Sequence, residues 1–151
     1  MTTDERWSTP GVVPVLAYVD VPAALEWLSR AFGFIERADA RLTWDGGCRA
    51  WMETGDGLVC LSTSGGHGLV SPAVSGSTSQ TTKVYVADID ANFARSQSAG
   101  ATIVSELQDG FWGGRVYRAK DLEGHIWEFS QSGRDLAAQD WRLPPGLRRG
   151  R

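Results

Sequence analysis

The sequence repeats one order of secondary-structure elements, and this internal repeat limits the possible folds more than any other feature. In each copy, a predicted strand is followed by an aspartate, a helix of about three turns, a glycine and three further strands. The helices are expected between Asp20 and Gly33 and between Asp88 and Gly100. Aspartate favours a helix start because its carboxylate accepts hydrogen bonds from free backbone N–H groups, and glycine tolerates the left-handed conformation at the end. One βαβββ unit is too small to enclose a core, so we expect the two copies to pair.

The predicted elements are short strands and two single helices. In the first copy they are a strand over 12–19, a helix over 22–32 and strands over 34–44, 48–53 and 58–62. In the second copy they are a strand over 82–87, a helix over 89–99 and strands over 101–105, 115–120 and 125–130. The intervening residues 63–80 are rich in Ser, Gly and Thr, which predicts a loop.

These elements predict an α+β fold, in which two tandem βαβββ modules form a curved mixed sheet around a cavity. The length of 151 residues suits a single domain. We expect module one at 11–64, a loop at 65–80, module two at 81–131 and a tail at 132–151.

The charges are distributed unevenly between the modules and the tail. The formal net charge is −3, but residues 142–151 contain four arginines and no acidic residue. Residues 1–141 therefore carry 11 basic and 18 acidic residues, a net charge of −7. Binding to nucleic-acid phosphates needs a surplus of Lys and Arg, so the acidic modules argue against a nucleic-acid partner. The same charge favours a cationic ligand over an anionic one.

The sequence shows no sign of export or of membrane insertion. Its first residues contain no apolar signal-peptide core, and no apolar run is long enough to span a bilayer. Cys48 and Cys60 do not form a CxxC pair, which argues against a zinc ribbon or a thioredoxin-type motif. We therefore expect a cytoplasmic protein with reduced thiols and no membrane partner.

Three segments resemble the vicinal oxygen chelate superfamily, which includes glyoxalase I, extradiol dioxygenases and the bleomycin- and fosfomycin-resistance proteins. VLAYVDVPAALEWLSRAFGF and VYVADIDANFARSQSAGA resemble the opening strand and helix of its two modules. GGRVYRAKDLEGHIWEFSQ, residues 113–131, is similar to its closing hairpin, with Leu122 in place of the usual proline. The resemblance covers residues 11–131 and implies a homodimer with cavities near the subunit contact. It does not identify a reaction, because this fold supports many chemistries.

The resemblance also suggests where a metal ion would bind. Metal enzymes of the superfamily take one ligand from each of four strands, and the corresponding positions here are Val13, Cys60, Thr81 and Glu128. Only Glu128 is a conventional ligand for a divalent ion. A register shift of one residue would replace Thr81 by Gln80. The sequence thus favours a protein without a cofactor, and the alternative is a divalent metal held by Glu128 with Gln80 or Cys60.

Strand alternation places Glu128 on the opposite face from Trp127 and Phe129. If the aromatic face packs on the helices, Glu128 points into the cavity. A buried carboxylate is costly unless it is paired. The alternatives are an ion pair with Arg115 or Lys83, a contact to a cationic ligand, and a role as a catalytic base.

Aromatic residues indicate a small-molecule site. The chain contains seven tryptophans and three tyrosines. Tyr85 lies opposite Val84 and Val86 on its strand, so it should face the cavity. A cleft lined by aromatic rings and a few polar groups is typical of a site for a planar or cationic small molecule. The predicted ligand-binding residues are Trp51, Cys60, Tyr85, Trp112, Arg115, Tyr117 and Glu128.

Other conspicuous residues have structural interpretations. We expect His67 to be a solvated loop residue and His125 to form a hydrogen bond to backbone at the closing turn. Trp7 and Trp141 lie in the terminal segments and could hold those segments to the body or to a second subunit.

The leading hypothesis is a metal-free protein that binds and sequesters a planar or cationic small molecule, resembling the bleomycin-resistance branch and conferring antibiotic resistance. The alternative is a metal-dependent lyase, isomerase or dioxygenase that uses Glu128 with a non-standard ligand set. A third interpretation is a regulatory or interaction module whose pocket has lost its function. The sequence leaves open whether the protein is an enzyme, and it does not identify the ligand.

Overall fold

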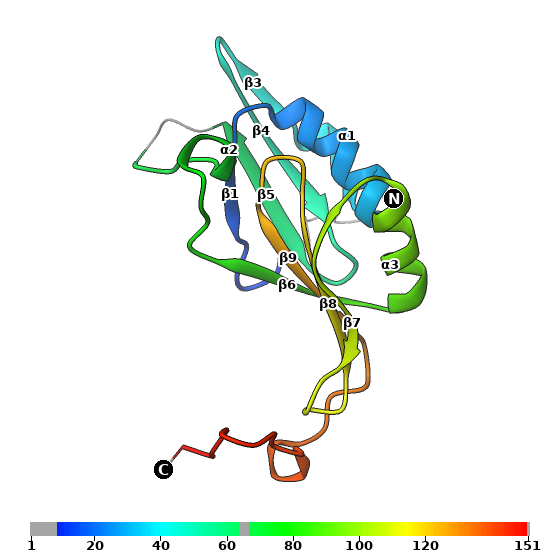
Figure 1. Cartoon of the computed structure of the whole chain (residues 1–151). Coiled ribbons are helices and arrows are strands. Elements are labelled where there is room, and N and C mark those ends of the chain that lie inside the picture. The colour runs from blue at the N-terminus through cyan, green and yellow to red at the C-terminus, as the bar shows by residue number, and fades with distance from the viewer. Residues whose placement is uncertain (1–8, 64–66, 151) are drawn as a thin grey trace.

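The structure is a computed structural model that describes residues 9–63 and 67–150, and its elements follow the predicted repeat (Figure 1). Module one consists of β1 (Val15–Tyr18), α1 (Val21–Phe32), β2 (Ile35–Glu36), the 3-10 helix η1 (Ala38–Ala40), β3 (Leu42–Trp44), β4 (Gly47–Glu53) and β5 (Leu58–Thr63). Module two consists of β6 (Thr81–Val86), α3 (Ile89–Ser98), β7 (Thr102–Asp109), β8 (Arg115–Lys120) and β9 (Ile126–Gln131). The short helix α2 (Pro72–Ser75) lies between the modules, and the 3-10 helix η2 (Ala138–Asp140) lies in the tail.

The strands form two mixed sheets. The first has the order β1-β5-β4-β2, with β3 paired to β4, and the second has the order β6-β9-β8-β7. In each sheet the opening strand pairs in parallel with the last strand of its own module, and the remaining pairs are antiparallel. The α+β class with two tandem modules is therefore confirmed. The described strands lie in two separate sheets rather than in one curved sheet.

Both long helices begin and end where the repeat predicts. The Asp20 carboxylate accepts a hydrogen bond from the Ala23 backbone N–H (3.1 Å), and the Asp88 carboxylate accepts one from Ala91 (3.0 Å). α1 ends at Gly33, which has a positive φ of 74° that few other residues tolerate. The two aspartates are thus helix caps, as expected from their position ahead of each helix.

The two modules share one hydrophobic core. α1 and α3 lie beside each other on one side of the sheets (Figure 1). Phe32 of α1 contacts Phe129 of β9 with ring centroids 4.8 Å apart, and Phe34 contacts Trp127 at 5.2 Å. Trp127 and Phe129 are fully buried, which confirms that this face of β9 is the core face. The faces directed away from the helices are consequently the ones available to a ligand.

A buried polar network joins the β8–β9 turn to module one. Asp121 accepts hydrogen bonds from the Tyr18 hydroxyl (2.6 Å) and from Trp127 Nε1 (3.0 Å). Glu123 accepts a hydrogen bond from the backbone N–H of Val19 (2.6 Å). Buried carboxylates are stable only when such donors satisfy them. Both acidic residues of the closing turn therefore have structural partners that belong to the first module.

Three local features differ from the sequence-based expectation. The segment 34–44 contains two short strands separated by η1, and the predicted loop contains α2. α2 forms because Ser71 supplies a side-chain cap and Pro72 suits the first turn. β7 continues to Asp109, and its pairing with β8 passes through two register shifts, where the ladder is locally irregular. Trp7 lies outside the described residues.

The tail runs alongside the tip of the β7–β8 hairpin, and the two project together away from the sheets (Figure 1). The backbone N–H of Leu136 donates to the Trp112 carbonyl (2.7 Å), and that of Arg142 donates to the Phe111 carbonyl (3.0 Å). The Trp141 ring packs edge-on against Phe111. Trp141 thus holds the tail to the β7–β8 hairpin, the first of the two alternatives left open by the sequence. No helix in the described part of the chain is long and apolar enough to cross a membrane.

Candidate functional site

Aromatic and charged side chains gather on the outer face of the second sheet. Lys83 Nζ lies 5.2 Å from the ring centroid of Tyr85 and 4.9 Å from that of Trp112. Lys83 belongs to β6 and Trp112 precedes β8, so the indole reaches across β9. Tyr85 is 44% exposed whereas the neighbouring Val84 is buried, which confirms the predicted alternation along β6.

Glu128 lies at the centre of this face and is flanked by two cations. Its carboxylate is 2.5 Å from Arg118 Nη2 and 3.4 Å from Lys83 Nζ. The strand register places these three residues side by side on β8, β9 and β6. Of the alternatives for Glu128, the ion pair with Lys83 is present, and the second cation is Arg118 rather than Arg115. We refer to Lys83, Tyr85, Trp112, Arg118 and Glu128 as the outer-face cluster.

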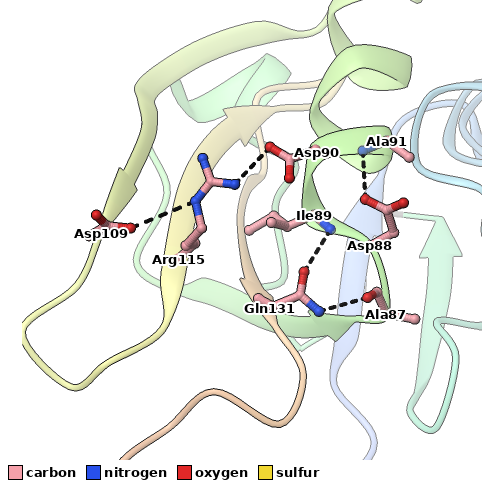
Figure 2. A network of polar contacts seen from close by, with 8 residues as sticks. All are labelled: Ala87, Asp88, Ile89, Asp90, Ala91, Asp109, Arg115 and Gln131. Atoms are coloured by element: carbon pink, nitrogen blue, oxygen red, sulfur yellow. Dashed lines mark hydrogen bonds and ion pairs between the residues drawn. The ribbon is translucent and has the colours of Figure 1, made fainter.

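Two of the predicted ligand-binding residues lie on the opposite face. Arg115 donates to Asp90 in α3 (2.7 Å) and lies 3.7 Å from Asp109 (Figure 2). Tyr117 is fully buried and donates to Asn92 of α3. Burial raises the pKa of Tyr117 to about 12. The structure does not bring either side chain to the outer face, because Arg115 and Tyr117 occupy the positions on β8 that face α3.

The contacts of Arg115 belong to a network that fastens α3 to the sheet (Figure 2). Gln131 of β9 accepts a hydrogen bond from the Ile89 backbone N–H (3.0 Å) and donates one to the Ala87 carbonyl (2.6 Å). Together with the Asp88 cap, these bonds satisfy backbone groups around the start of the helix. The network is thus a structural feature of the module.

Trp51 and Cys60 lie together on the outer face of the first sheet. They are direct partners across β4 and β5, and the Arg49 guanidinium lies 5.5 Å from the Trp51 ring centroid. Cys60 is fully buried, and burial raises the pKa of its thiol. A raised pKa disfavours the thiolate that a nucleophile or metal ligand requires. The structure thus divides the predicted site residues between two sheets and two faces.

Two clefts border the outer-face cluster. One, of about 430 Å³, is lined by Trp112 and Arg118 together with Pro144 of the tail. The other, of about 480 Å³, is lined by Lys83 and Tyr85, by the β4–β5 turn and by residues 132–133. Volumes of a few hundred Å³ accommodate a molecule with several fused rings.

Glycines allow the Trp112 indole to lie close to its own hairpin. A Cβ atom at Gly110 would come within 2.6 Å of the indole, and one at Gly114 would come within 2.8 Å of Nε1. Ser130 lies on the outer face of β9, fully buried, and its hydroxyl has no hydrogen-bond partner within the described part of the chain. Buried hydroxyls are normally hydrogen-bonded. Among the described residues, Ser130 is therefore an unpaired polar group beneath the outer-face cluster, covered from solvent in this structure.

The donor set does not fit a divalent metal ion. Within residues 9–63 and 67–150, no three His, Cys, Asp or Glu side chains come close enough to hold one. Glu128 already contacts two cations, Cys60 lies in the other sheet, and Gln80 lines a separate cleft beside β1. Val13 and Thr81 add no conventional ligand. These positions therefore lack the convergent ligands that metal chemistry needs.

The two histidines have the structural roles that the sequence suggests. His125 is buried, and its Nε2 donates to the Ala17 carbonyl (2.7 Å), which joins the closing turn to β1. His67 is exposed in the loop between the modules. Neither residue belongs to the outer-face cluster.

Sequence reasoning missed Arg118, Ser130 and Asp135 as site residues. Alternation along β8 separates Arg118 from Tyr117, and it could have located Arg118 once the core face of β8 was known. Asp135 accepts a hydrogen bond from the Tyr85 hydroxyl (2.5 Å), and this bond raises the pKa of Tyr85. No pattern in the sequence indicates this contact, because the two residues are joined only by the path of the tail.

Comparison with known proteins identifies the family. Residues 12–129 match the family model of the Glyoxalase/Bleomycin resistance protein/Dioxygenase superfamily, and the chain belongs to this superfamily. An uncharacterized protein of Mycobacterium bovis is 31% identical over 137 residues, covering 84% of this chain and 86% of that protein. An uncharacterized protein of Mycobacterium tuberculosis is also 31% identical, over 84% of this chain and 77% of its own length.

Solved structures share the fold. The crystal structure of TioX from Micromonospora sp. ML1 is 38% identical in sequence, with a TM-score of 0.65, and the alignment covers 85% of this chain and all of TioX. A glyoxylase/bleomycin resistance protein/dioxygenase domain from Frankia sp. EAN1pec has a TM-score of 0.63 at 18% identity, covering 82% of this chain and 98% of that domain. The second likeness concerns the fold alone. The region that matches the family model ends at residue 129, so the tail lies outside the matched region.

Proposed function

We propose that this protein binds and sequesters a planar small molecule on the outer face of its second sheet, without a metal ion. The observation that carries the proposal is the position of Lys83 between Tyr85 and Trp112, beside a charge-compensated Glu128. Two aromatic rings and a polar floor next to open clefts form the usual environment for a flat aromatic ligand. Sequestration is consistent with two features of the site residues. The candidate metal ligands do not converge, and the Cys60 thiol is not activated.

The geometry of the outer-face cluster favours a ligand that is recognised by its flat shape rather than by a positive charge. Lys83 already occupies the cation position near both aromatic rings. A cationic ligand would have to displace Lys83 from Tyr85 and Trp112 and approach Arg118. We therefore propose a planar ligand and treat the cationic one as an outcome of the test.

Antibiotic sequestration and dimerisation are further parts of the proposal. The family name includes bleomycin resistance proteins, which supports a resistance role without identifying the compound. The outer faces of both sheets point away from the shared core, so each face offers one wall of a site that a second copy could complete. We propose a homodimer on this ground, and sedimentation analysis would measure it. The cytoplasmic location stays a prediction from the sequence.

Direct titration with three planar probes tests the proposal. Acridine is neutral at pH 8, proflavine is cationic and 2-naphthalenesulfonate is anionic, and calorimetry measures the affinity for each. We expect saturable binding of at least one probe. Replacement of Trp112 by alanine should weaken this binding about tenfold, because stacking of one ring is worth about 1–3 kcal/mol.

The matched control is Trp44→Ala, which removes a half-exposed indole from the distant β3–β4 hairpin. This variant should bind as the unmodified protein does. Equal losses in the two variants, or no saturable binding of any probe, would contradict the proposed site. Stoichiometric divalent metal in protein purified without added metal would contradict the metal-free part.

A further inference from the structure

We infer that the C-terminal segment 132–149, which follows the matched family region, is a wall of the ligand site and restricts it to flat molecules. The inference rests on the proposed function, because it concerns the same outer-face cluster. It assigns a selective role to a segment that the repeat does not contain.

The segment is attached directly to two residues of the cluster. Asp135 accepts the hydrogen bond from the Tyr85 hydroxyl, and the Leu136 backbone N–H donates to the carbonyl of Trp112. The chain passes so close to the hairpin that a Cβ atom at Gly113 would lie 2.6 Å from Leu136 and 2.9 Å from the Arg134 carbonyl. The segment therefore limits where the Tyr85 and Trp112 rings can move.

The same segment lines both clefts beside the cluster. Pro144 lies in the cleft with Trp112 and Arg118. Ser132 and Gly133 line the cleft with Lys83 and Tyr85. A ligand in the first cleft would contact both Trp112 and Pro144. Stacking on an indole favours a flat aromatic ring over a bulky group.

The segment contributes little to the fold itself. The hydrophobic core of the described residues contains no residue beyond Phe129. β9 ends at Gln131, and the following backbone N–H, of Ser132, donates to Val86. A chain that ends at Gly133 retains these elements and should fold. The contacts of residues 134–149 are therefore available for a role in binding.

The test compares the full chain, a chain ending at Gly133, and the variants Asp135→Ala and Asp140→Ala. Asp140 is the control, because it lies in the same segment, carries the same charge and is exposed. The probes are acridine, proflavine and 2-naphthalenesulfonate, which are flat, and 1-adamantanol, which is bulky and neutral. Absorbance titration of the tyrosines provides a measurement that needs no ligand.

We expect the truncated chain and Asp135→Ala to bind the flat probe at least fivefold more weakly than the full chain, with Asp140→Ala unchanged. 1-Adamantanol should gain affinity relative to the flat probe only in the truncated chain, which a purely stabilising tail would not produce. The pKa of Tyr85 should fall in Asp135→Ala, because the hydrogen bond that raises it is lost.

The possible failures are distinguishable. If the full chain binds a flat probe and the truncated chain binds it equally well, the segment is not a wall and only this inference fails. If the Tyr85 pKa is the same in Asp135→Ala and in the full chain, the attachment is absent and the inference is overturned. If the full chain binds no probe, the proposed function fails and the inference fails with it.

Discussion

The hydroxyl of Tyr18 donates a hydrogen bond of 2.6 Å to Asp121, and 103 residues of sequence separate the two. Tyr18 ends the first strand of module one, and Asp121 begins the closing turn of module two. Both residues are buried. The DLEGHIW segment of the closing hairpin therefore stabilises the contact between the modules, and its polar residues need no catalytic role to explain them.

Asp121→Asn should destabilise the protein by about 3 kcal/mol. The substitution turns one of the two acceptor oxygens into a donor, which leaves a buried donor such as the Tyr18 hydroxyl or Trp127 Nε1 without an acceptor. Urea denaturation measures the free energy of unfolding. Asp56→Asn, at an exposed turn, is the control and should change it by less than about 0.5 kcal/mol. Similar values for the two variants would show that the network contributes little.

Stability should fall between about pH 10 and pH 12. Burial raises the pKa of Tyr117 from 10.0 to about 12, so the folded state holds the phenolic proton more tightly than the unfolded state. The resulting stabilisation is complete below pH 10 and is lost as the pH rises through the folded-state pKa. Tyr117→Phe should show a shallower decline in urea denaturation across this range. Parallel pH profiles for the two proteins would rule out Tyr117 as the cause.

Glu128→Gln should change both stability and ligand charge preference. Removing the carboxylate leaves Lys83 and Arg118 close together without compensation, which we expect to cost about 1 kcal/mol in a partly exposed site. Binding of 2-naphthalenesulfonate should strengthen relative to proflavine. Calorimetry measures both affinities, with the exposed Glu106→Gln as the control. An unchanged ratio of affinities would place the ligand away from Glu128.

Comparing Gly113→Ala with Gly46→Ala distinguishes the effect of a collision with the tail from the effect of backbone strain alone. Both glycines have positive φ values, 95° and 84°, so alanine should cost each hairpin about 1 kcal/mol. Only at Gly113 would the added Cβ collide with the tail, at Leu136. Hydrogen exchange at the Leu136 amide should therefore accelerate in Gly113→Ala alone. Equal exchange in the two variants would mean that the tail does not depend on this close approach.

Short-range patterns predicted much of the fold. The aspartate before each helix and Gly33 after the first predicted the helix ends, because these residues act on backbone groups within four positions. Alternation predicted that Trp127 and Phe129 would share one face of β9, opposite Glu128, and that Tyr85 would lie opposite Val84, which is buried in the core. α2 was missed because a helix of four residues has no apolar period to detect.

The same patterns were less informative about the candidate site. Arg115 and Tyr117 were expected to contact a ligand, but both face α3. A period of two assigns residues to alternate faces without showing which face is covered, and that depends on how β8 pairs with β9. Tyr117 lies directly across from Phe129 in this register, and Phe129 belongs to the core.

The sequence by itself determined the two modules, the helix ends, the alternation of the strands and the acidic body with its arginine-rich end, because all of these depend on neighbouring residues. Only the tertiary structure decided that Arg118 joins Lys83 in flanking Glu128, that Trp51 and Tyr85 lie on different sheets, and that Asp135 returns to Tyr85. These relationships join residues from separate strands or from the tail. Their physical origin is strand register and chain path, which a local pattern does not specify.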